Sequence, residues 1–249
     1  MSERAGATKT VYQERVALRD WTPTWIRYQH VGRYEWILPR VAGLRVADAA
    51  CGNGYGAAMM AGSAASVDGF DLSEQAVEEA RERYGASGAV FTAADILALP
   101  RPDACYDAFV SFETIEHLPD TDAYLREIRR VLKPGGTFYC STPNRLITNP
   151  GTSITDKPYN PWHLREFSPA ELETALRRVF AEVTLLGQCF FGRPYAGALA
   201  SIGRTLPAAA VRTHQLRKVA SMPFDRAQRH VPQPLHAGHE PEALVAYCR

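Results

Sequence analysis

The chain has 249 residues, of which 46% are apolar and 22% are charged. This length and composition predict one compact globular domain with a full hydrophobic core, and they exclude a disordered or fibrous protein. The 28 lysine and arginine residues nearly balance the 27 aspartate and glutamate residues, which gives a formal net charge of +1. That balance excludes a protein that binds nucleic acid or an anionic membrane through its overall charge.

The sequence shows no signal for export, membrane insertion or disulfide formation. The segment MSERAGATKTVYQERV lacks the apolar core of a secretory signal, and no apolar run approaches the roughly 20 residues that cross a bilayer. We therefore expect a cytoplasmic protein with no membrane partner. The cysteines are scattered and form no CxxC pair, so we expect reduced thiols and no metal site. They are Cys51, Cys105, Cys140, Cys189 and Cys248.

From residue 44 onward, short apolar runs alternate with longer helical stretches. This alternation is typical of an α/β fold with a doubly wound, mostly parallel sheet. Each predicted strand is short and apolar, as expected for a strand that is covered on both faces. The predicted strands are Leu44–Ala49, Ser66–Phe70, Val90–Thr92, Tyr106–Phe112 and Thr137–Ser141, and 243–248 is a further candidate.

Polar side chains mark the starts of the helices between these strands. The most complete signal is Ser168-Pro169-Ala170-Glu171, with a hydroxyl cap, a proline at the first helical position and a glutamate three residues after the cap. Lys133-Pro134-Gly135-Gly136 ends the helix that begins near Thr121 and turns the chain into the fifth strand. The predicted helices are Glu74–Tyr84 with Ser73 as cap, one that Thr121 or Asp122 caps, and one from Ser168 to about Val179.

A glycine-rich loop, Asp48-Ala-Ala-Cys-Gly-Asn-Gly-Tyr-Gly56, follows the first strand at the place where open α/β sheets bind nucleotides. Gly52-x-Gly54 with Asp71 nineteen residues after Gly52 also fits a dinucleotide site. Asp48 argues against that reading, because a carboxylate at the strand end disfavours an anionic pyrophosphate. A cationic ligand without phosphate, such as S-adenosylmethionine with its sulfonium and ammonium, fits the loop better.

Five segments in order resemble the class I S-adenosylmethionine-dependent methyltransferases, in particular the small-molecule enzymes of the methyltransferase type 11 kind. These segments are VADAACGNGYG, GFDLS, AADI, YDAFVSFE with TIEHLPD, and LKPGG. The resemblance covers roughly residues 30–190 and implies a Rossmann-like methyltransferase fold. It also implies S-adenosyl-L-methionine as cofactor and S-adenosyl-L-homocysteine as product.

The resemblance assigns a part of the cofactor to each of these segments. Asp48, Ala50, Gly52 and Gly54 would frame the methionine part, and Ala50 stands where most members have glycine. Asp71 with Leu72 would hold the ribose, Asp95 with Ile96 the adenine, and Phe112 with Glu113 would border the sulfonium, while Arg33 or Tyr34 could reach the cofactor from the N-terminal segment. Structural roles stay open: Asp71 as a helix cap, Asp95 as a loop carboxylate, and Phe112, Arg33 and Tyr34 as core residues.

Two histidines are candidates for catalysis, because a hydroxyl acceptor must lose a proton during methyl transfer. His117 follows the fourth strand, and His163 lies in the connection after the fifth, so both belong at the carboxyl edge of the sheet. We consider His117 the leading base candidate, with His163 as a second base or a substrate ligand. Either histidine could instead have only a structural role.

We expect residues 1–249 to form a single methyltransferase domain with four parts. These are a helical N-terminal lid at 1–41, a cofactor-binding core at 42–189, a late helical, substrate-side insertion at 190–235 and a final strand at 236–249. The segment 190–230 holds seven basic residues against one acidic residue. Arginines there would suit an anionic acceptor, although a solvated helix face is the alternative.

The favoured function is O-methylation of a small molecule, such as a sugar or secondary-metabolite hydroxyl. The segments TPN and NPWHLREFSPAEL are similar to those of methyltransferases that modify sugars, polysaccharides and secondary metabolites. N- or C-methylation of a similar molecule is an alternative, followed by an RNA or protein methyltransferase, a nicotinamide oxidoreductase and a binding protein without activity. No nucleic-acid partner is expected, and the sequence does not reveal the oligomeric state.

Overall fold

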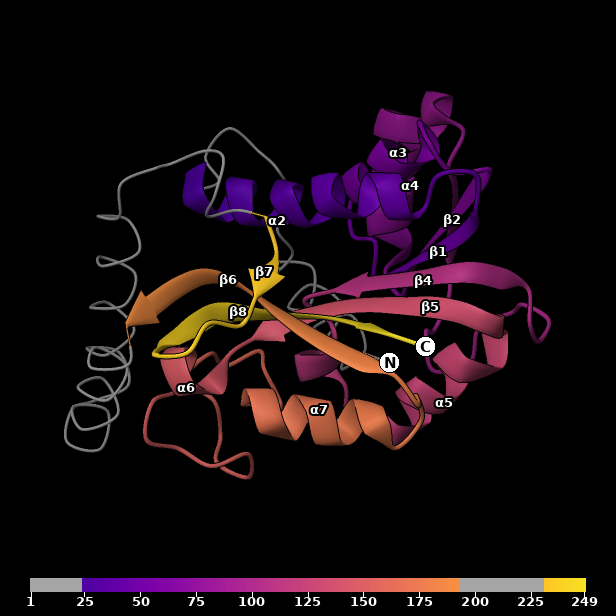
Figure 1. Cartoon of the computed structure of the whole chain (residues 1–249). Helices are drawn as coiled ribbons and strands as arrows, with labels where there is room; N and C mark the ends of the chain where they lie inside the picture. The colour runs from indigo at the N-terminus through magenta and orange to yellow at the C-terminus, as the bar shows by residue number, and fades with distance from the viewer. Residues whose placement is uncertain (1–23, 193–230) are drawn as a thin grey trace, which may run out of the picture.

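The computed structural model describes residues 24–192 and 231–249, and one mixed sheet forms their centre (Figure 1). The strand order is β3-β2-β1-β4-β5-β8-β6-β7. Strands β1 to β5 are parallel, and β8 runs antiparallel between β5 and β6. The strands are β1 (Arg45–Ala49), β2 (Ser66–Asp71), β3 (Val90–Ala93), β4 (Tyr106–Phe112), β5 (Leu132–Pro143), β6 (Val183–Gly192), β7 (Gln233–Pro234) and β8 (His239–Cys248).

Helices cover both faces of the sheet, which confirms the predicted doubly wound α/β class (Figure 1). Helices α2, α3 and α4 lie on one face, and α5 and α7 lie on the other, with the short α6 beyond the end of β5. The strand order reverses between β1 and β4, which is where open α/β sheets bind their ligands. The helices are α2 (Thr24–Ile37), α3 (Tyr55–Ala61), α4 (Glu74–Tyr84), α5 (Thr121–Val131), α6 (Arg145–Thr148) and α7 (Pro169–Arg177).

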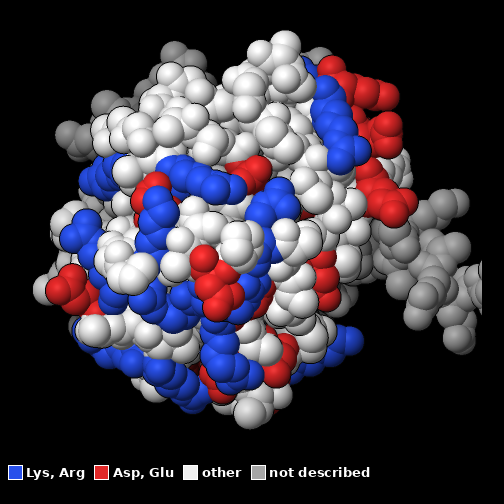
Figure 2. All heavy atoms as spheres, turned by 90° about the vertical axis from the view of Figure 1, so that its right-hand side faces the viewer, with Lys and Arg blue, Asp and Glu red and all other residues white. Residues whose placement is uncertain are grey.

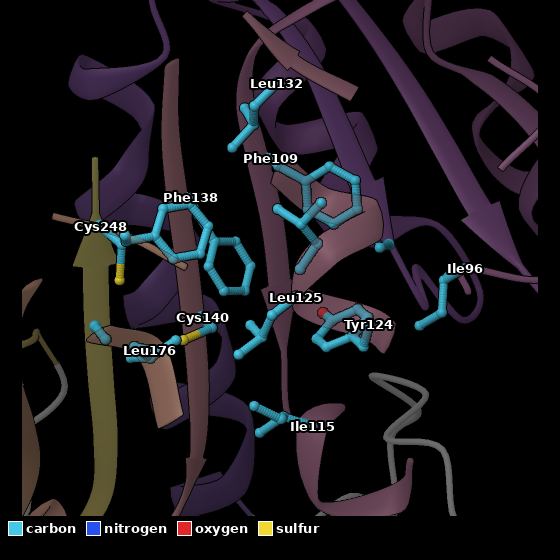
Figure 3. Close-up of a cluster of buried hydrophobic side chains, with 14 of the residues drawn as sticks. Ile96, Phe109, Ile115, Tyr124, Leu125, Leu132, Phe138, Cys140, Leu176 and Cys248 are labelled. Carbon is cyan, nitrogen blue, oxygen red and sulfur yellow. The ribbon is translucent and has the colours of Figure 1, made fainter. Parts of the chain in front are cut away.

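The hydrophobic core lies in two layers, one on each face of the sheet. On one face Phe109 of β4 and Phe138 of β5 meet edge to face, with ring centroids 6.0 Å apart. Leu125 of α5 and Leu176 of α7 pack in the same layer (Figure 3). The buried residues of α5 recur at three- and four-residue spacing, so one stripe of that helix faces the sheet. This rigid packing fixes the carboxyl ends of β4 and β5.

The predicted starts of two helices are confirmed, whereas the predicted cap of a third helix is wrong. Ser73 caps α4 by accepting a hydrogen bond from the Ala76 backbone N–H, and Ser168 forms a complete capping box at α7. The cap of α5 is Asp120, rather than Thr121 or Asp122, because its side chain accepts from the Ala123 backbone N–H at 2.8 Å.

The fifth strand begins earlier than predicted, at Leu132 instead of Thr137. Leu132 pairs with Tyr106, and the register then shifts so that Thr137 pairs with Ala108. The Lys133-Pro134-Gly135-Gly136 turn is therefore a bulge within the strand, with Gly135 in the left-handed region at φ +75°.

The edge of the sheet where β4 and β5 begin carries interleaved acidic and basic side chains (Figure 2). Ion pairs here include Lys133 with Asp107 at 2.7 Å and Arg45 with Asp68 at 3.5 Å. Acidic and basic side chains thus lie next to one another on this face of the described residues.

All five cysteines are buried free thiols, as the sequence predicted. Within residues 24–192 and 231–249, the structure has no helix whose length and apolar character would let it span a bilayer. The expectations for residues 1–23 of the N-terminal lid, and for most of the insertion at 190–235, fall on residues 1–23 and 193–230, outside the described part of the chain.

Candidate active site

The loop after β1 turns through several left-handed backbone conformations. Gly52 has a φ of +56° and Gly54, which precedes α3, has a φ of +86°. Ala50 also adopts a positive φ, +55°. Glycine reaches this region without steric cost, which explains why the related family prefers glycine at the position of Ala50. The loop thus brings bare backbone close to the end of β2, where the Gly52 N–H donates to Asp71 Oδ2 at 2.9 Å.

Gly56 allows the side chain of Tyr34 to reach this loop from α2. A Cβ atom at Gly56 would lie 2.0 Å from Cζ of the Tyr34 ring. The ring also packs edge to face against Phe112 of β4, with centroids 5.1 Å apart. Its hydroxyl donates a hydrogen bond to Asp48 Oδ1 at 3.3 Å. The absence of a side chain at position 56 therefore fixes α2 against the end of β1.

Replacing Gly56 by alanine is expected to destabilise the chain by about 1–3 kcal/mol, because the new methyl group overpacks the Tyr34 ring. Alanine normally stabilises a helical position by about 1 kcal/mol relative to glycine. A loss of stability in Gly56→Ala would therefore indicate the clash with Tyr34. Gly85→Ala is the matched control, since Gly85 has a helical φ of −56° and open space around its Cβ position. Thermal unfolding of both variants tests this, and equal melting temperatures would contradict it.

Asp48 lies at the end of β1 and is fully buried. Its Oδ1 accepts from Tyr34, while its Oδ2 has no hydrogen-bond donor among the described residues. Burial raises the pKa of Asp48 from 3.8 to about 7. A buried carboxylate oxygen without a donor is costly, so this position suits a ligand that brings a positive charge or N–H donors.

Asp71 ends β2 and organises two backbone segments. Its Oδ2 accepts from Gly52 N–H and its Oδ1 from Ser73 N–H, both at 2.9 Å. Ser73, and not Asp71, is the cap of α4. A carboxylate offers about four acceptor positions, of which these two backbone groups use two. The carboxylate of Asp71 is therefore held rigidly at the edge of the sheet where a ribose is expected.

The remaining predicted cofactor residues lie at the same edge. Leu72 is 68% exposed, directly after β2, while Ile96 is buried after β3. Asp95 is exposed and its Oδ1 accepts from Leu97 N–H at 2.9 Å, so it also stabilises its own loop. Phe112 is buried at the end of β4. The structure brings these side chains to one edge, as their places after parallel strands predicted.

Arg33 is buried in α2 and contacts protein groups from two strands. Its guanidinium lies 2.8 Å from Glu113 Oε1 and donates to Gln188 Oε1 of β6 at 2.6 Å. Glu113 also accepts from Ser141 Oγ at 2.8 Å. Burial raises the pKa of Glu113, but Arg33, followed by His30, outweighs it and leaves the pKa below its ordinary value. The arginine thus keeps a carboxylate ionised at the end of β4.

Apart from Arg33 and Glu113, the residues of this polar network were not predicted as site residues. Glu113 and Cys189 have positive φ values, +53° and +55°, and such strain in residues other than glycine clusters at functional sites. Gln29 donates to Glu242 of β8 at 2.6 Å and to Cys189 Sγ at 3.1 Å. Burial raises the pKa of Glu242 to about 7. No local motif marks Gln29, Gln188 or Glu242, because their contacts join distant parts of the chain.

The two predicted catalytic histidines lie together beyond the end of β4. Their ring centroids are 4.8 Å apart, with an interplanar angle of 83°. His117 Nδ1 lies 3.1 Å from the Trp162 carbonyl oxygen, and His163 Nδ1 lies 2.5 Å from Glu166 Oε1. Burial, followed by the neighbouring His163, lowers the pKa of His117 to about 4. The His117 imidazole is therefore neutral at pH 7.

Two glutamates lie next to the histidine pair, Glu116 beside His117 and Glu166 beside His163. Glu116 is fully buried, and its Oε2 accepts from Thr142 Oγ1 at 2.9 Å. Burial, with a contribution from Glu113, raises the pKa of Glu116 to about 8. Glu166 Oε2 accepts hydrogen bonds from the side chains of Thr148 and Asn149. A pair of imidazoles held by two buried carboxyl groups is costly to bury, which makes this cluster a candidate reactive site.

The fold and this edge of the sheet define a methyltransferase of class I, and comparisons with known proteins agree. The family model described as "Methyltransferase domain" matches residues 47–140. A "probable S-adenosylmethionine-dependent methyltransferase" of Mycolicibacterium smegmatis is 39% identical over 201 residues, which is 81% of this chain and 74% of that protein. The chain belongs to the S-adenosylmethionine-dependent methyltransferases, and S-adenosylmethionine is its cofactor.

Further relatives match shorter parts. A Mycobacterium tuberculosis methyltransferase is 39% identical over 66% of this chain, which spans 58% of that protein. The 27-O-demethylrifamycin SV methyltransferase of Amycolatopsis mediterranei is 42% identical over 40% of this chain and 39% of its own length.

Solved structures share the fold at low identity. A methyltransferase of Thermotoga maritima superposes with a TM-score of 0.61 at 17% identity, over 90% of each chain. The DhpI structure in complex with S-adenosylhomocysteine has a TM-score of 0.59 at 19% identity, over 98% of this chain and 95% of that one. These likenesses support the Rossmann-like methyltransferase fold.

Proposed function

We propose that this methyltransferase transfers a methyl group to a hydroxyl group of a small molecule, with a sugar or a secondary metabolite as the acceptor class. The observation that carries the proposal is the pair His117 and His163, whose rings lie 4.8 Å apart at the carboxyl edge of the sheet. A hydroxyl acceptor needs a group that handles its proton, whereas an amine often needs none. The pair supplies that function where cofactor and acceptor meet.

Two relatives give independent support for an oxygen acceptor. One is the rifamycin methyltransferase named above, and another is a ubiquinone biosynthesis O-methyltransferase of Thiobacillus denitrificans, 37% identical over 45% of this chain and 51% of that protein. Both enzymes are named for methylation at an oxygen of a small molecule. An acceptor with an anionic group remains part of the proposal, because 190–230 is rich in arginine.

S-adenosylmethionine supplies a methyl group on a positively charged sulfur. The residues present fit this cofactor: Asp48 offers a buried oxygen without a donor to its cationic methionine part, and Asp71 offers a fixed carboxylate to its ribose hydroxyls. Phe112 ends β4 and packs against the Tyr34 ring, whose hydroxyl contacts Asp48. The chain then orients the acceptor oxygen in line with the methyl carbon, excludes water and directs the hydroxyl proton away at His117 and His163.

Replacing Asp71 by alanine is expected to weaken the affinity for S-adenosylhomocysteine by about 1.5–3 kcal/mol, the scale of hydrogen bonds to a charged group. Titration calorimetry measures the dissociation constant directly. Asp71→Asn is the companion variant, because it removes the charge and keeps a single oxygen, which can accept from only one of the Gly52 and Ser73 backbone groups. A dissociation constant unchanged in both variants would mean that the ribose is held elsewhere.

The acceptor class is tested with S-adenosylmethionine that carries a labelled methyl group. Full-length protein is incubated with hydroxylated sugars, phenols and polyketide alcohols, and in parallel with matched amines and carboxylic acids. The proposal predicts label in an ether that survives mild alkali, which separates it from a methyl ester. Label found only in amines, carbon-methylated products or macromolecules would overturn the proposal.

A further inference from the structure

Three side chains from two separate segments meet beyond the carboxyl end of β4. One potential metal ligand atom from each of Glu116, His117 and His163 lies within 4.8 Å of those of the other two. Glu116 Oε1 is 3.9 Å from His117 Nε2. Ligand atoms about 2.1 Å from a bound ion are roughly 3.0–3.4 Å apart. Side-chain movements on the order of 1 Å therefore bring the three atoms into coordination range.

Both imidazoles are held in the way that is usual for histidines that bind metal, through a hydrogen bond from the other ring nitrogen. The Trp162 carbonyl oxygen can only accept, so the nearby His117 Nδ1 carries the proton. His163 Nδ1 donates to Glu166 Oε1, and its Nε2 accepts from the Asn160 amide. The same tautomer fits both rings and places the lone pair on Nε2. A bound ion would replace the Asn160 amide at His163.

Glu116 offers a carboxyl group whose proton a bound divalent cation would displace, which supplies a negative ligand. Its side chain is 1% exposed, and Thr142 fixes its Oε2. Its Oε1, on the side of His117, has no hydrogen-bond donor among the described residues. Since a buried acceptor without a donor is costly, a cation between this oxygen and the two imidazoles would compensate for the charge. His117 is 32% exposed, so the site is open to a further ligand on that side.

We propose that Glu116, His117 and His163 bind one divalent metal ion that accepts nitrogen and oxygen ligands, in the class of Zn²⁺, Mn²⁺, Fe²⁺ and Co²⁺. Two histidines and one carboxylate leave coordination positions open for exogenous ligands. The sequence did not predict a metal site. His117 and Trp162, which precedes His163, are 45 residues apart in the chain, so no short ligand motif contains both histidines.

The role of this ion rests on the proposed methylation of a hydroxyl. The acceptor hydroxyl would occupy an open position on the ion, which lowers the pKa of that hydroxyl. Its proton passes to solvent water. The oxygen lone pair then forms the new bond to the methyl carbon, while the bond from that carbon to sulfur breaks and sulfur keeps the electron pair. With both Nε2 lone pairs directed at the ion, the two histidines would promote this proton loss through the metal, instead of accepting the proton themselves as they would without it.

Cobalt titration of the full-length, tag-free and chelator-treated protein tests the site. We expect one Co²⁺ per chain, with visible absorption bands of a nitrogen- and oxygen-ligated ion. Glu116→Gln, which keeps an acceptor for Thr142, and His163→Ala should each weaken Co²⁺ binding by at least about 100-fold. The control is His239→Ala, an exposed histidine at the start of β8. Binding that persists in both site variants, or that is lost in the control, would overturn the proposal.

S-adenosylhomocysteine binding and methyl transfer separate the two proposals. The metal-free chain should retain its affinity for S-adenosylhomocysteine, lose methyl transfer to the hydroxyl acceptor, and regain it when Co²⁺ or Mn²⁺ is added. Full activity of the metal-free chain would overturn the role of the ion while hydroxyl methylation stands. If no hydroxyl acceptor is methylated with or without metal, the proposed function fails, and the cobalt titration still decides the metal site.

Discussion

His117→Ala is expected to lower kcat for hydroxyl methylation by about 10²–10⁴-fold, the usual contribution of a positioned side chain that handles a proton. The affinity for S-adenosylhomocysteine should not change, because the proposed function places His117 at the acceptor and Asp48 and Asp71 at the cofactor. The substitution removes the hydrogen bond to the Trp162 carbonyl and the edge-to-face contact with His163, so a stability loss of about 1–3 kcal/mol is expected. Single-turnover rates with labelled cofactor, together with calorimetry, measure both quantities.

His163→Ala should give a similar loss of rate with a larger loss of stability. His163 is 9% exposed and donates to Glu166, which is itself buried, so its removal leaves a carboxylate oxygen without its donor. His239→Ala again serves as the control. If His117→Ala keeps at least half of the wild-type rate with a hydroxyl acceptor, the histidine pair is not the activating group, and an amine acceptor becomes the better explanation.

Local signals in the sequence predicted most of the fold. The capping box at Ser168 and Glu171 is complete within four residues, and the structure shows both of its hydrogen bonds. The parallel strands β1 to β4 are short apolar runs whose positions shift by one residue at most. Such features depend on neighbours in the chain, so periodicity and capping chemistry are sufficient to find them.

Features that depend on tertiary pairing were less predictable. Asp120 caps α5 although Thr121 and Asp122 are equally suitable residue types, and only the backbone geometry distinguishes them. Leu132 joins β5 because it pairs with Tyr106 across a register shift. No propensity scale encodes that pairing, and the glycines at 135 and 136 read as a turn on their own.

In the candidate site, too, residues next to strand ends could be predicted from the sequence, whereas contacts between distant parts of the chain could not. Asp48 and Asp71 follow strands directly, so their place at the sheet edge could be predicted from the order of elements. The contact of Arg33 with Gln188 spans 155 residues, and that of Gln29 with Glu242 spans 213. Neither contact leaves a motif in the sequence. The orientation of Arg33 toward Glu113 could therefore be found only in the folded chain, whereas the sequence had suggested Arg33 as a residue that could reach the cofactor or lie in the core.

The second large effect concerns Asp48: replacing it by asparagine should raise the stability of the fold and lower the affinity for the cofactor. Burial raises its pKa from 3.8 to about 7, so the folded chain favours the protonated carboxyl. The stability that this group contributes is fully present below about pH 4 and is lost as pH rises through 7. A shift of about three pKa units corresponds to about 4 kcal/mol. Asp48→Asn should remove this cost and raise the melting temperature at pH 8 more than at pH 5.

The same substitution should weaken cofactor binding, because the ionised carboxylate is the form that attracts the cationic methionine part. In the wild-type chain, S-adenosylmethionine affinity should fall about 10-fold from pH 8 to pH 6, as Asp48 takes up a proton. In Asp48→Asn the affinity should be lower and independent of pH in this range. Calorimetry across this range and differential scanning calorimetry at pH 5 and 8 measure both effects.

Asp107→Asn is the matched control, since Asp107 lies at the opposite edge of the sheet in an ion pair with Lys133. It should lower stability slightly and leave cofactor affinity unchanged at every pH. If Asp48→Asn binds S-adenosylmethionine as tightly as the wild type, or keeps the wild-type pH dependence, the buried carboxylate does not face the cofactor. A donor for its Oδ2 must then come from the chain itself, and Asp48 would have a structural role only.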